Sequence, residues 1–562
     1  MRKVALLILV VVMSFTNQGN VFAASEDEQW PIPNEPAVGH HSVLIGEQAD
    51  GFKSYSQLST QYEKGYFLCK SVSDENCSKG WYYNYNAVLP VCDIAAQVNC
   101  IEGLSARKEG GEVKVATFDQ YTYENHPNMY VGDVSKGIPM AGAPSIWKLP
   151  GMPHSGGDEY ALVAGLSGNL HKTDTNYVNE DFYLHLAPVS RKSGISSDGD
   201  DSGFNNYNKC IQKISPEGIG SLACGGGVQD VGKFKCAVKT DKASDCYLQR
   251  PFPADTRFEV RVRLAKEPIS WMHGRMFNPT IEVTSLSSGG VKLTVEAGSV
   301  KVPIFYSGGQ FSTLDKELQE YWDKCIPIRT CGFSTRSTSN FAKEPNGNLR
   351  NVQDNAESYG DRALGIIKTF VKSASDKSVA VPTTWNIRSL TKTEMSKANG
   401  CFNSGSGIKG IVTTNSTTYS EGPPTFSDGF LNYKVASAHF NPDGTEFKGT
   451  YNLVIRSDVA RCLYKFSSAP LSASIQVVTD NGEPSVSTTL FGERKGWVEL
   501  AAYNFEFSSP TVRVKLEQEA SVGNKLSPKV SVKKSSITCV KGKSVKKVTA
   551  QKPKCPTGYK KR

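Results

Sequence analysis

Apolar and polar residues alternate most regularly between residues 257 and 303. Two runs there, 281–283 and 291–295, follow the same alternation and are separated by glycines at 289 and 290. A period of two is typical of a strand with one buried face, and three such strands joined by glycine turns predict an antiparallel sheet. The buried face of the first predicted strand would carry Phe258, Val260, Val262 and Leu264.

Shorter alternating runs predict strands on both sides of this block. They lie at residues 113–118, 160–163, 182–186, 431–435, 451–455 and 512–516. Residues 477–486 predict a hairpin, because Asn481 and Gly482 suit the left-handed conformation of a type I′ turn. Several strands with turns at short intervals predict a β-sandwich over residues 401–518.

Three segments have the 3.6-residue period of a helix. The first would begin with Ser312 as its N-cap, and the second would span residues 361–372. The third would begin at a capping box formed by Thr391 and Glu394 and would end at Gly400. We therefore expect a small helical segment between blocks of β structure.

The N-terminus has the pattern of a secretory signal peptide. Arg2 and Lys3 precede a short apolar run at residues 4–12, and a small-residue cleavage site ends at Ala23. No later apolar run is long enough to be a transmembrane helix. The sequence therefore predicts a protein exported by a signal peptide of residues 1–23, and placed outside the cell or at its surface without a transmembrane span.

Cysteine usage agrees with export. The count is even and no pair has Cys-x-x-Cys spacing, so disulfides are expected rather than a zinc or redox motif. The cysteines are Cys69, Cys77, Cys92, Cys100, Cys210, Cys224, Cys236, Cys246, Cys325, Cys331, Cys401, Cys462, Cys539 and Cys555. Short spacing favours the bridges 69–77, 92–100, 325–331 and 539–555. Cys401 and Cys462 would form the one long-range bridge. The spacing of the four cysteines between 210 and 246 leaves their pairing open.

Length and composition favour a multidomain β protein. Removal of 23 residues from 562 leaves enough chain for roughly three or four domains, and 50 glycines with 28 prolines favour turn-rich β structure. We expect a mainly β fold of tandem antiparallel sandwich-like domains, stapled by disulfides. The expected parts are a signal peptide (1–23), a cysteine-rich β domain (24–250), a β block with a helical segment (251–400), a β-sandwich (401–522) and a basic tail with a 539–555 hairpin (523–562).

Positive charge is concentrated at the C-terminus. Residues 524–562 contain 13 lysines or arginines and no acidic residue, whereas the whole chain is +9, so residues 1–523 carry −4. Removal of Arg2 and Lys3 with the signal peptide would leave that body at −6. Such a block is typical of an interaction tail that attracts polyanions, although a solubilising tail or a small disulfide hairpin is the simpler alternative.

The residues expected to bind a polyanion are cations of this tail. They are Lys533, Lys534, Lys541, Lys543, Lys546, Lys547, Lys552, Lys554, Lys560, Lys561 and Arg562. Outside a cell, the available polyanions are wall teichoic acids or other anionic glycans, anionic lipids and stray nucleic acid. We expect an anionic cell-wall polymer or another surface polyanion as the partner, and no specific nucleic acid.

The C-terminal third carries several distinctive segments. They are GIVTTNS (410–416), GPP (422–424), IRSDVARCLY (455–464), ERKGWVEL (493–500), FSSPTVRVKL (507–516), ITCVKGK (537–543) and PKCPTGYKK (553–561). In these segments, roughly residues 401–562, the chain resembles exported actinobacterial cell-surface proteins of unassigned function. The resemblance implies an envelope-associated protein and supplies no catalytic residues.

Motifs with an established catalytic mechanism are missing from the sequence. It contains no Gly-x-Ser-x-Gly elbow, no His-Glu-x-x-His, no phosphate-binding loop and no dinucleotide fingerprint. His154, Asp158 and Glu159 lie in one glycine-rich stretch and could serve as acid and base, but a solvated turn is the stronger interpretation. No cofactor is indicated, and we assign no catalytic residue.

Two further groups are candidate binding residues. Asp198, Asp200 and Ser202 match the first half of a calcium loop, but position 12 is a lysine, so a flexible acidic loop is the favoured interpretation over a weak calcium site. A separate aromatic group could stack against sugar rings, although alternating aromatics in a strand more often divide between core and cross-strand pairs. Its members are Trp81, Tyr82, Tyr83 and Tyr85.

These observations together favour a protein that acts by binding at the cell surface, in adhesion or in a structural role. A secreted glycan-active hydrolase with carboxylates scattered over several strands is one alternative, because local motifs would not reveal it. A purely structural component of the envelope is the other. A groove with exposed aromatic side chains and paired carboxylates would favour the hydrolase, and a closed sandwich with one exposed apolar patch would favour binding or assembly.

Overall fold

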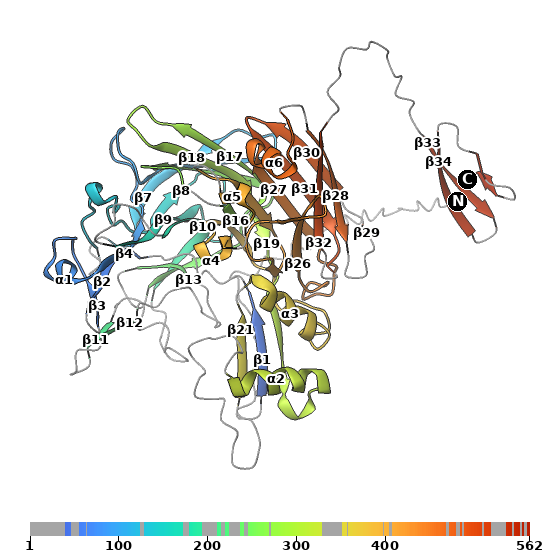
Figure 1. Ribbon diagram of the computed structural model, residues 1–562, viewed down its shortest axis with the longest axis horizontal. Coiled ribbons are helices and arrows are strands. Elements are labelled where there is room, and N and C mark those ends of the chain that lie inside the picture. Colours follow the sequence, from blue (N-terminus) through green and yellow to red (C-terminus); the bar gives the residue numbers. More distant parts are fainter. Residues whose placement is uncertain are drawn as a thin grey trace, which may run out of the picture. The chain divides into compact units, whose positions relative to one another are not determined.

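The structure is a computed structural model (Figure 1). It describes residues 40–46, 55–62, 65–123, 129–171, 179–193, 211–214, 220–223, 236–240, 245–268, 271–328, 351–356, 358–396, 398–403, 407–467, 471–478, 484–485, 488–507, 511–518, 535–541, 544–550, 554–555 and 559–561. The chain divides into a first unit, residues 1–517, and a basic C-terminal unit, residues 518–562. The predicted signal peptide and the predicted calcium ligands Asp198, Asp200 and Ser202 lie outside the described residues.

The predicted sheet around residue 257 is present, with five strands. Its order is β17 (Phe277–Ser285), β18 (Val291–Gly298), β15 (Thr256–Leu264), β5 (Cys100–Lys108) and β6 (Lys114–Val115), all antiparallel. Buried and half-buried residues alternate without exception along β15, and Phe258, Val260 and Val262 have no exposed surface. The period of two in the sequence therefore gave the correct buried face.

A second, larger sheet runs through most of the first unit. Its main path is β3 (Gly65–Leu68), β2 (Gln57–Tyr62), β4 (Tyr82–Val88), β9 (Glu159–His171), β10 (Asn179–Lys192), β22 (Thr383–Ser389), β16 (Trp271–Arg275), β23 (Gly410–Thr414), β27 (Gly449–Arg456), β31 (Trp497–Phe505) and β30 (Thr488–Arg494). Joined to this path are β7 (Thr117–Tyr121), β8 (Ser145–Lys148), β13 (Cys236–Lys239), β14 (Cys246–Gln249) and β19 (Val300–Lys301). This sheet takes strands from all three predicted β regions. The domain boundaries at residues 250 and 400 stay predictions.

Two hydrophobic cores pack against this long sheet. The apolar face of the five-stranded sheet packs on its N-terminal part, where Phe258 meets Tyr160 of β9 with ring centroids 5.4 Å apart. The C-terminal part packs against a six-stranded sheet through residues such as Leu453 and Val512. That sheet contains β24 (Thr418–Tyr419), β25 (Thr425–Ser427), β26 (Phe430–Ala436), β28 (Leu471–Val478), β29 (Pro484–Ser485) and β32 (Thr511–Gln518).

The described chain is thus mainly β, with several antiparallel sheets and few helices, as predicted. The smaller sheets are β20 (Phe305–Gln310), β1 (His40–Ile45) and β21 (Asn351–Ala356) in one group, and β11 (Ile211–Ile214) with β12 (Gly220–Ala223) in another. The expected 477–486 hairpin is formed by β28 and β29, which pair antiparallel, and its turn lies outside the described residues. Among the described residues, no helix is long and apolar enough to cross a bilayer.

Helix positions agree with the sequence only in part. α3 (Gly360–Phe370) lies where the second helix was predicted, and it packs with α2 (Lys316–Ile328) beside β1 in one small core (Figure 1). The prediction that Ser312 caps α2 is wrong, because Asp315 accepts the Leu318 amide at 2.9 Å and the helix begins at Lys316.

The third predicted helix begins as expected but ends at Met395, before the predicted end at Gly400. Thr391 and Glu394 form the capping box of α4 (Lys392–Met395). Gly400 does not stop this helix but opens the next one, α5 (Gly400–Asn403). Two short helices were not predicted, α1 (Glu75–Lys79) and α6 (Ser457–Tyr464).

Three of the expected disulfides are present. Cys69–Cys77 and Cys92–Cys100 each close eight residues, and Cys401–Cys462 joins α5 to α6 across 61 residues. Cys555 is also disulfide-bonded, and the described part of the chain contains no free cysteine. Cys331, Cys210 and Cys224 lie outside the described residues, so the 325–331 bridge and the pairing of the cysteines at 210 and 224 stay predictions.

Candidate functional site

The four aromatic residues proposed for sugar stacking do not share a surface. Tyr83 and Tyr85 point into the core and are 5% and 1% exposed, so the proposal is wrong for these two residues. Trp81 is exposed, and the Tyr82 hydroxyl donates to Gln61 Oε1 at 2.7 Å. Burial alternates over the first four residues of β4, so Tyr83 and Tyr85 face the core, and of the four aromatic residues only Trp81 and Tyr82 reach solvent.

The segment around His154 is a structural turn. His154 and Gly157 exchange backbone hydrogen bonds, and the His154 ring is held at both nitrogens. Nε2 lies 2.8 Å from the Glu159 carbonyl oxygen, and Nδ1 accepts the Gly156 amide at 3.1 Å. This arrangement requires a neutral ring, and burial also lowers the pKa of His154. The acid–base interpretation of this stretch therefore has no support in the geometry.

The basic C-terminal unit contains a small antiparallel sheet. β33 (Ser535–Lys541) pairs with β34 (Ser544–Ala550) on one side and with β35 (Lys560–Lys561) on the other. The register places Lys546 and Lys561 opposite Cys539, so cationic positions lie on strands at both sides of this residue. The described side chains of Lys541, Lys554, Lys560 and Lys561 are exposed, whereas Lys533, Lys534, Lys543, Lys552 and Arg562 lie outside the described residues.

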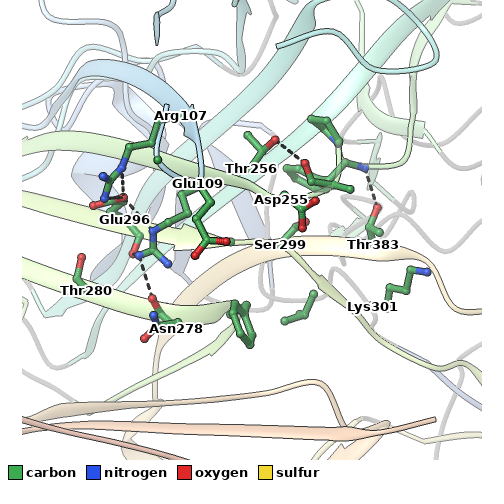
Figure 2. A pocket seen from close by; sticks show the side chains of 18 of the residues that line it. Arg107, Glu109, Asp255, Thr256, Asn278, Thr280, Glu296, Ser299, Lys301 and Thr383 are labelled. Atoms are coloured by element: carbon green, nitrogen blue, oxygen red, sulfur yellow. Dashed lines mark hydrogen bonds and ion pairs between the residues drawn. The ribbon is translucent and has the colours of Figure 1, made fainter. Parts of the chain in front are cut away.

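A polar groove lies at one end of the five-stranded sheet, where β15 and β17 begin and β5 and β18 end (Figure 2). Its cavity has a volume of about 670 Å³ and is lined by β5, β15, β17, β18 and β19, with Arg494 contributed from β30. A smaller cavity of about 200 Å³ shares Thr280, Glu296 and Arg494 with it. The two cavities are therefore adjacent, and together they are called the groove below.

Charged side chains of neighbouring strands meet at the centre of the groove. The Arg107 Nε and Nη2 atoms donate to Glu296 Oε1 at 2.9 and 2.7 Å, and Arg257 Nε donates to the same oxygen at 3.0 Å. Antiparallel register places Arg107 directly opposite Arg257 on the face of the sheet away from the core. The alternation that buries Phe258 therefore also brings these cations to the groove.

Glu296 is held as a carboxylate by this arrangement. Burial alone would raise the pKa of Glu296, but the hydrogen bonds and charges of Arg107 and Arg257 outweigh it and hold the pKa below its usual range. All three guanidinium bonds go to Oε1, so Oε2 has no hydrogen-bond partner among the described residues. Glu296 is suited to accept a hydrogen bond from a ligand and is not suited to donate a proton as a general acid.

The rim of the groove has unusual backbone geometry. Asp255 and Asn278 have φ angles of 52° and 47°, in the left-handed region that few non-glycine residues occupy. A β-bulge between Phe277 and Thr280 re-aims this part of β17, and Phe277 is 39% exposed at the groove wall. Backbone strain of this kind is often found at functional sites.

A second polar cluster is buried inside the first unit. Arg275 has no exposed surface, and its guanidinium donates to the carbonyl oxygens of Thr414 and Ser416 at 3.0 and 2.7 Å. The guanidinium carbon lies 4.6 Å from the centroid of the Tyr419 ring, and the His273 ring stacks parallel to the same ring with centroids 3.6 Å apart. Arg275, His273 and Tyr419 are all buried, which indicates a structural role.

His273 should make stability depend on pH. Burial lowers the pKa of His273 well below its usual range, and the charges of Arg275 and Arg388 add to the effect. The folded protein then binds fewer protons here than the unfolded chain, so stability should fall as pH decreases below about 6.5, by about 1.4 kcal/mol per pH unit for one histidine.

Urea unfolding of the wild type and of His273→Gln between pH 7.5 and 5.5 tests this expectation. The substitution should flatten the dependence on pH, and the remaining slope should include the same-signed contribution of His154. Equal slopes in the two proteins would show that His273 takes up its proton as readily in the folded state as in the unfolded state.

No protein-family model matches the chain, and no curated protein is significantly similar to it. The resemblance to exported actinobacterial proteins therefore stays a prediction. The groove was not predicted from the sequence, because the residues that line it come from segments between Arg107 and Arg494 that are far apart in the chain. The one available signal was the run of charged residues alternating with the apolar face of β15.

Proposed function

We propose that this protein is exported, stays at the cell surface and acts by binding, with its basic C-terminal unit attached to an anionic cell-wall polymer. The observation that carries the proposal is the separation of charge along the chain. Residues 524–562 hold 13 cations and no acidic residue, whereas residues 1–523 carry −4. A cationic segment joined to an acidic body attracts a polyanion through that segment and not through the body.

The described residues of the basic unit support this role. Lys541, Lys560 and Lys561 lie on a three-stranded sheet, and their side chains are exposed. Successive side chains of a strand point to opposite faces, so cations on one face of a sheet lie about 7 Å apart along a strand and about 4.8 Å apart between strands, and several can face one polymer. The disulfides of the first unit and the predicted signal peptide support export.

Binding to immobilised wall teichoic acid tests the proposal with the full chain. We expect glutamine at six positions of the basic unit to weaken binding by about tenfold or more at low salt, because attraction between exposed charges adds up over the sheet. Wild-type binding should also decrease steeply as salt rises. The six positions are Lys541, Lys546, Lys547, Lys554, Lys560 and Lys561.

A matched control removes the same net charge from the first unit. Its six exposed positions are Lys108, Lys316, Lys372, Lys392, Lys434 and Lys515. The control should bind nearly as well as the wild type. If it weakens binding as much as the variant of the basic unit does, overall charge rather than the C-terminal unit is responsible, and the proposal fails.

A further inference from the structure

The charges that line the groove are almost balanced. The two cavities are lined by six carboxylates and five cations, a net charge of −1. The carboxylates are Glu109, Asp255, Glu259, Glu282, Glu296 and Glu499, and the cations are Arg107, Arg257, Lys301, Arg494 and Lys495. This balance differs sharply from the basic C-terminal unit, so the groove is not suited to the same polyanion.

Most of the cations are also paired within the protein. In addition to the Glu296 contacts, Arg494 Nε lies 2.8 Å from Glu499 Oε1, and Lys495 Nζ lies 3.2 Å from Glu282 Oε1. A charged ligand would compete with these pairs for its counter-charge. An uncharged ligand rich in hydroxyl groups would instead use the remaining acceptors, such as Glu296 Oε2, without breaking a pair.

Each cavity has an aromatic side chain in its wall. Phe277 lines the larger cavity and is 39% exposed, and its ring is supported by Tyr503 with centroids 4.9 Å apart. Trp497 is half-buried in the wall of the smaller cavity. A sugar ring has an apolar face and a polar rim, so it needs an aromatic surface with hydrogen-bonding groups at the side.

We infer that the groove binds an uncharged oligosaccharide, with one sugar ring on Phe277 and the chain continuing past Thr280 toward Trp497. The carboxylates between the two aromatic residues accept hydrogen bonds from the sugar hydroxyls, and the hydroxyl groups there both accept and donate them. This ligand is distinct from the polyanion proposed for the basic C-terminal unit. The two sites can therefore bind independently.

Calorimetric titration of the full chain with cellohexaose, maltohexaose and chitohexaose tests the inference. At about 0.5 M salt, where charge attraction extends only a few ångströms, at least one of these probes should bind and heparin should not. Affinity for the bound hexaose should change little between low and high salt. Failure of all three uncharged probes to bind would overturn the inference.

Substitutions in the groove locate the binding. Phe277→Ala should weaken hexaose binding by about tenfold, as loss of a central aromatic contact commonly does. Phe491→Ala is the control, because Phe491 is 38% exposed and lies on β30 outside both cavities. If the two substitutions weaken hexaose binding equally, the assignment of a sugar-binding position to Phe277 is wrong.

A blocking substitution tests the path between the cavities. Thr280→Trp adds a large side chain where the cavities join and should abolish binding of the hexaose, whereas Thr284→Trp on the exposed end of β17 should not. Neither change affects the basic unit, so teichoic acid binding at low salt should be normal in both. Loss of hexaose binding in both tryptophan variants would place the site elsewhere.

Discussion

Val262→Asp should destabilise the first unit by at least about 4 kcal/mol, a loss expected when an unpaired charge is placed in a core. Val262 has no exposed surface and lies between Ile101 of β5 and Leu293 of β18, both fully buried. An aspartate there would have only apolar neighbours on adjacent strands. It would either stay charged without a partner or take up a proton at a large cost.

Val262→Thr gives an intermediate case, because it keeps the shape and adds one hydroxyl group. It should cost about 1–3 kcal/mol, the usual cost of a buried polar group without a partner. Thr284→Asp, on an exposed position of β17, should cost less than about 1 kcal/mol. Thermal unfolding of the three variants should therefore show a graded decrease in midpoint.

The choice of control follows from the network on the other face of the sheet. Arg261 follows the alternation and points away from the core, but it contacts Glu259 and lies 3.8 Å from Glu102. An aspartate at this position would add a third carboxylate to the group, so it is not a neutral comparison. If Val262→Asp and Thr284→Asp lower the midpoint equally, the assignment of the buried face is wrong.

The sequence is informative where one local rule decides the structure. β15 could be predicted because its four apolar residues fall on one face without interruption, and α4 because Thr391 and Glu394 satisfy both halves of a capping box. Both features depend on residues within one strand or one turn. No knowledge of the rest of the fold is required for either.

The sequence fails where partners come from distant segments. Alternation in the aromatic run at residues 81–85 indicates that its side chains divide between two faces, but it does not tell which face meets the core. In the structure, the buried side chains are those of Tyr83 and Tyr85. α6 was missed because it is short and lies between strands, although Val459, Ala460 and Leu463 have helical spacing. Predicting the groove would have required the pairing register of the strands that line it and the position of Arg494. A local sequence pattern contains neither.

Glu394→Gln should destabilise the first unit by about 3–5 kcal/mol, because it leaves a largely buried cation without its counter-charge. The Glu394 side chain is 2% exposed and that of Arg388 is 17% exposed. Arg388 donates from Nη1 and Nη2 to the two carboxylate oxygens at 2.8 and 2.7 Å. Glutamine can still complete the capping box with Thr391, so the loss would come mainly from the ion pair.

Arg388→Met should have a cost of similar size, since it leaves Glu394 buried without its cation. Burial alone would raise the pKa of Glu394, but the hydrogen bonds and charge of Arg388 outweigh burial and lower this pKa. The ion pair therefore stabilises the fold above the ordinary glutamate pKa, and this stabilisation is lost as the pH falls below about 4.3. In both single variants, the free energy of unfolding should consequently decrease less than in the wild type as the pH falls through this range.

The double variant Arg388→Met with Glu394→Gln separates the charge from the packing. Removing both charges leaves no unpaired ion, so the double variant should be more stable than either single variant, with a coupling of about 2–3 kcal/mol. Urea unfolding at pH 7 gives the four free energies of the cycle. Additive losses would mean that each side chain acts through other contacts, such as Arg388 with the ring of Tyr359, 5.0 Å away, and that the ion pair contributes little.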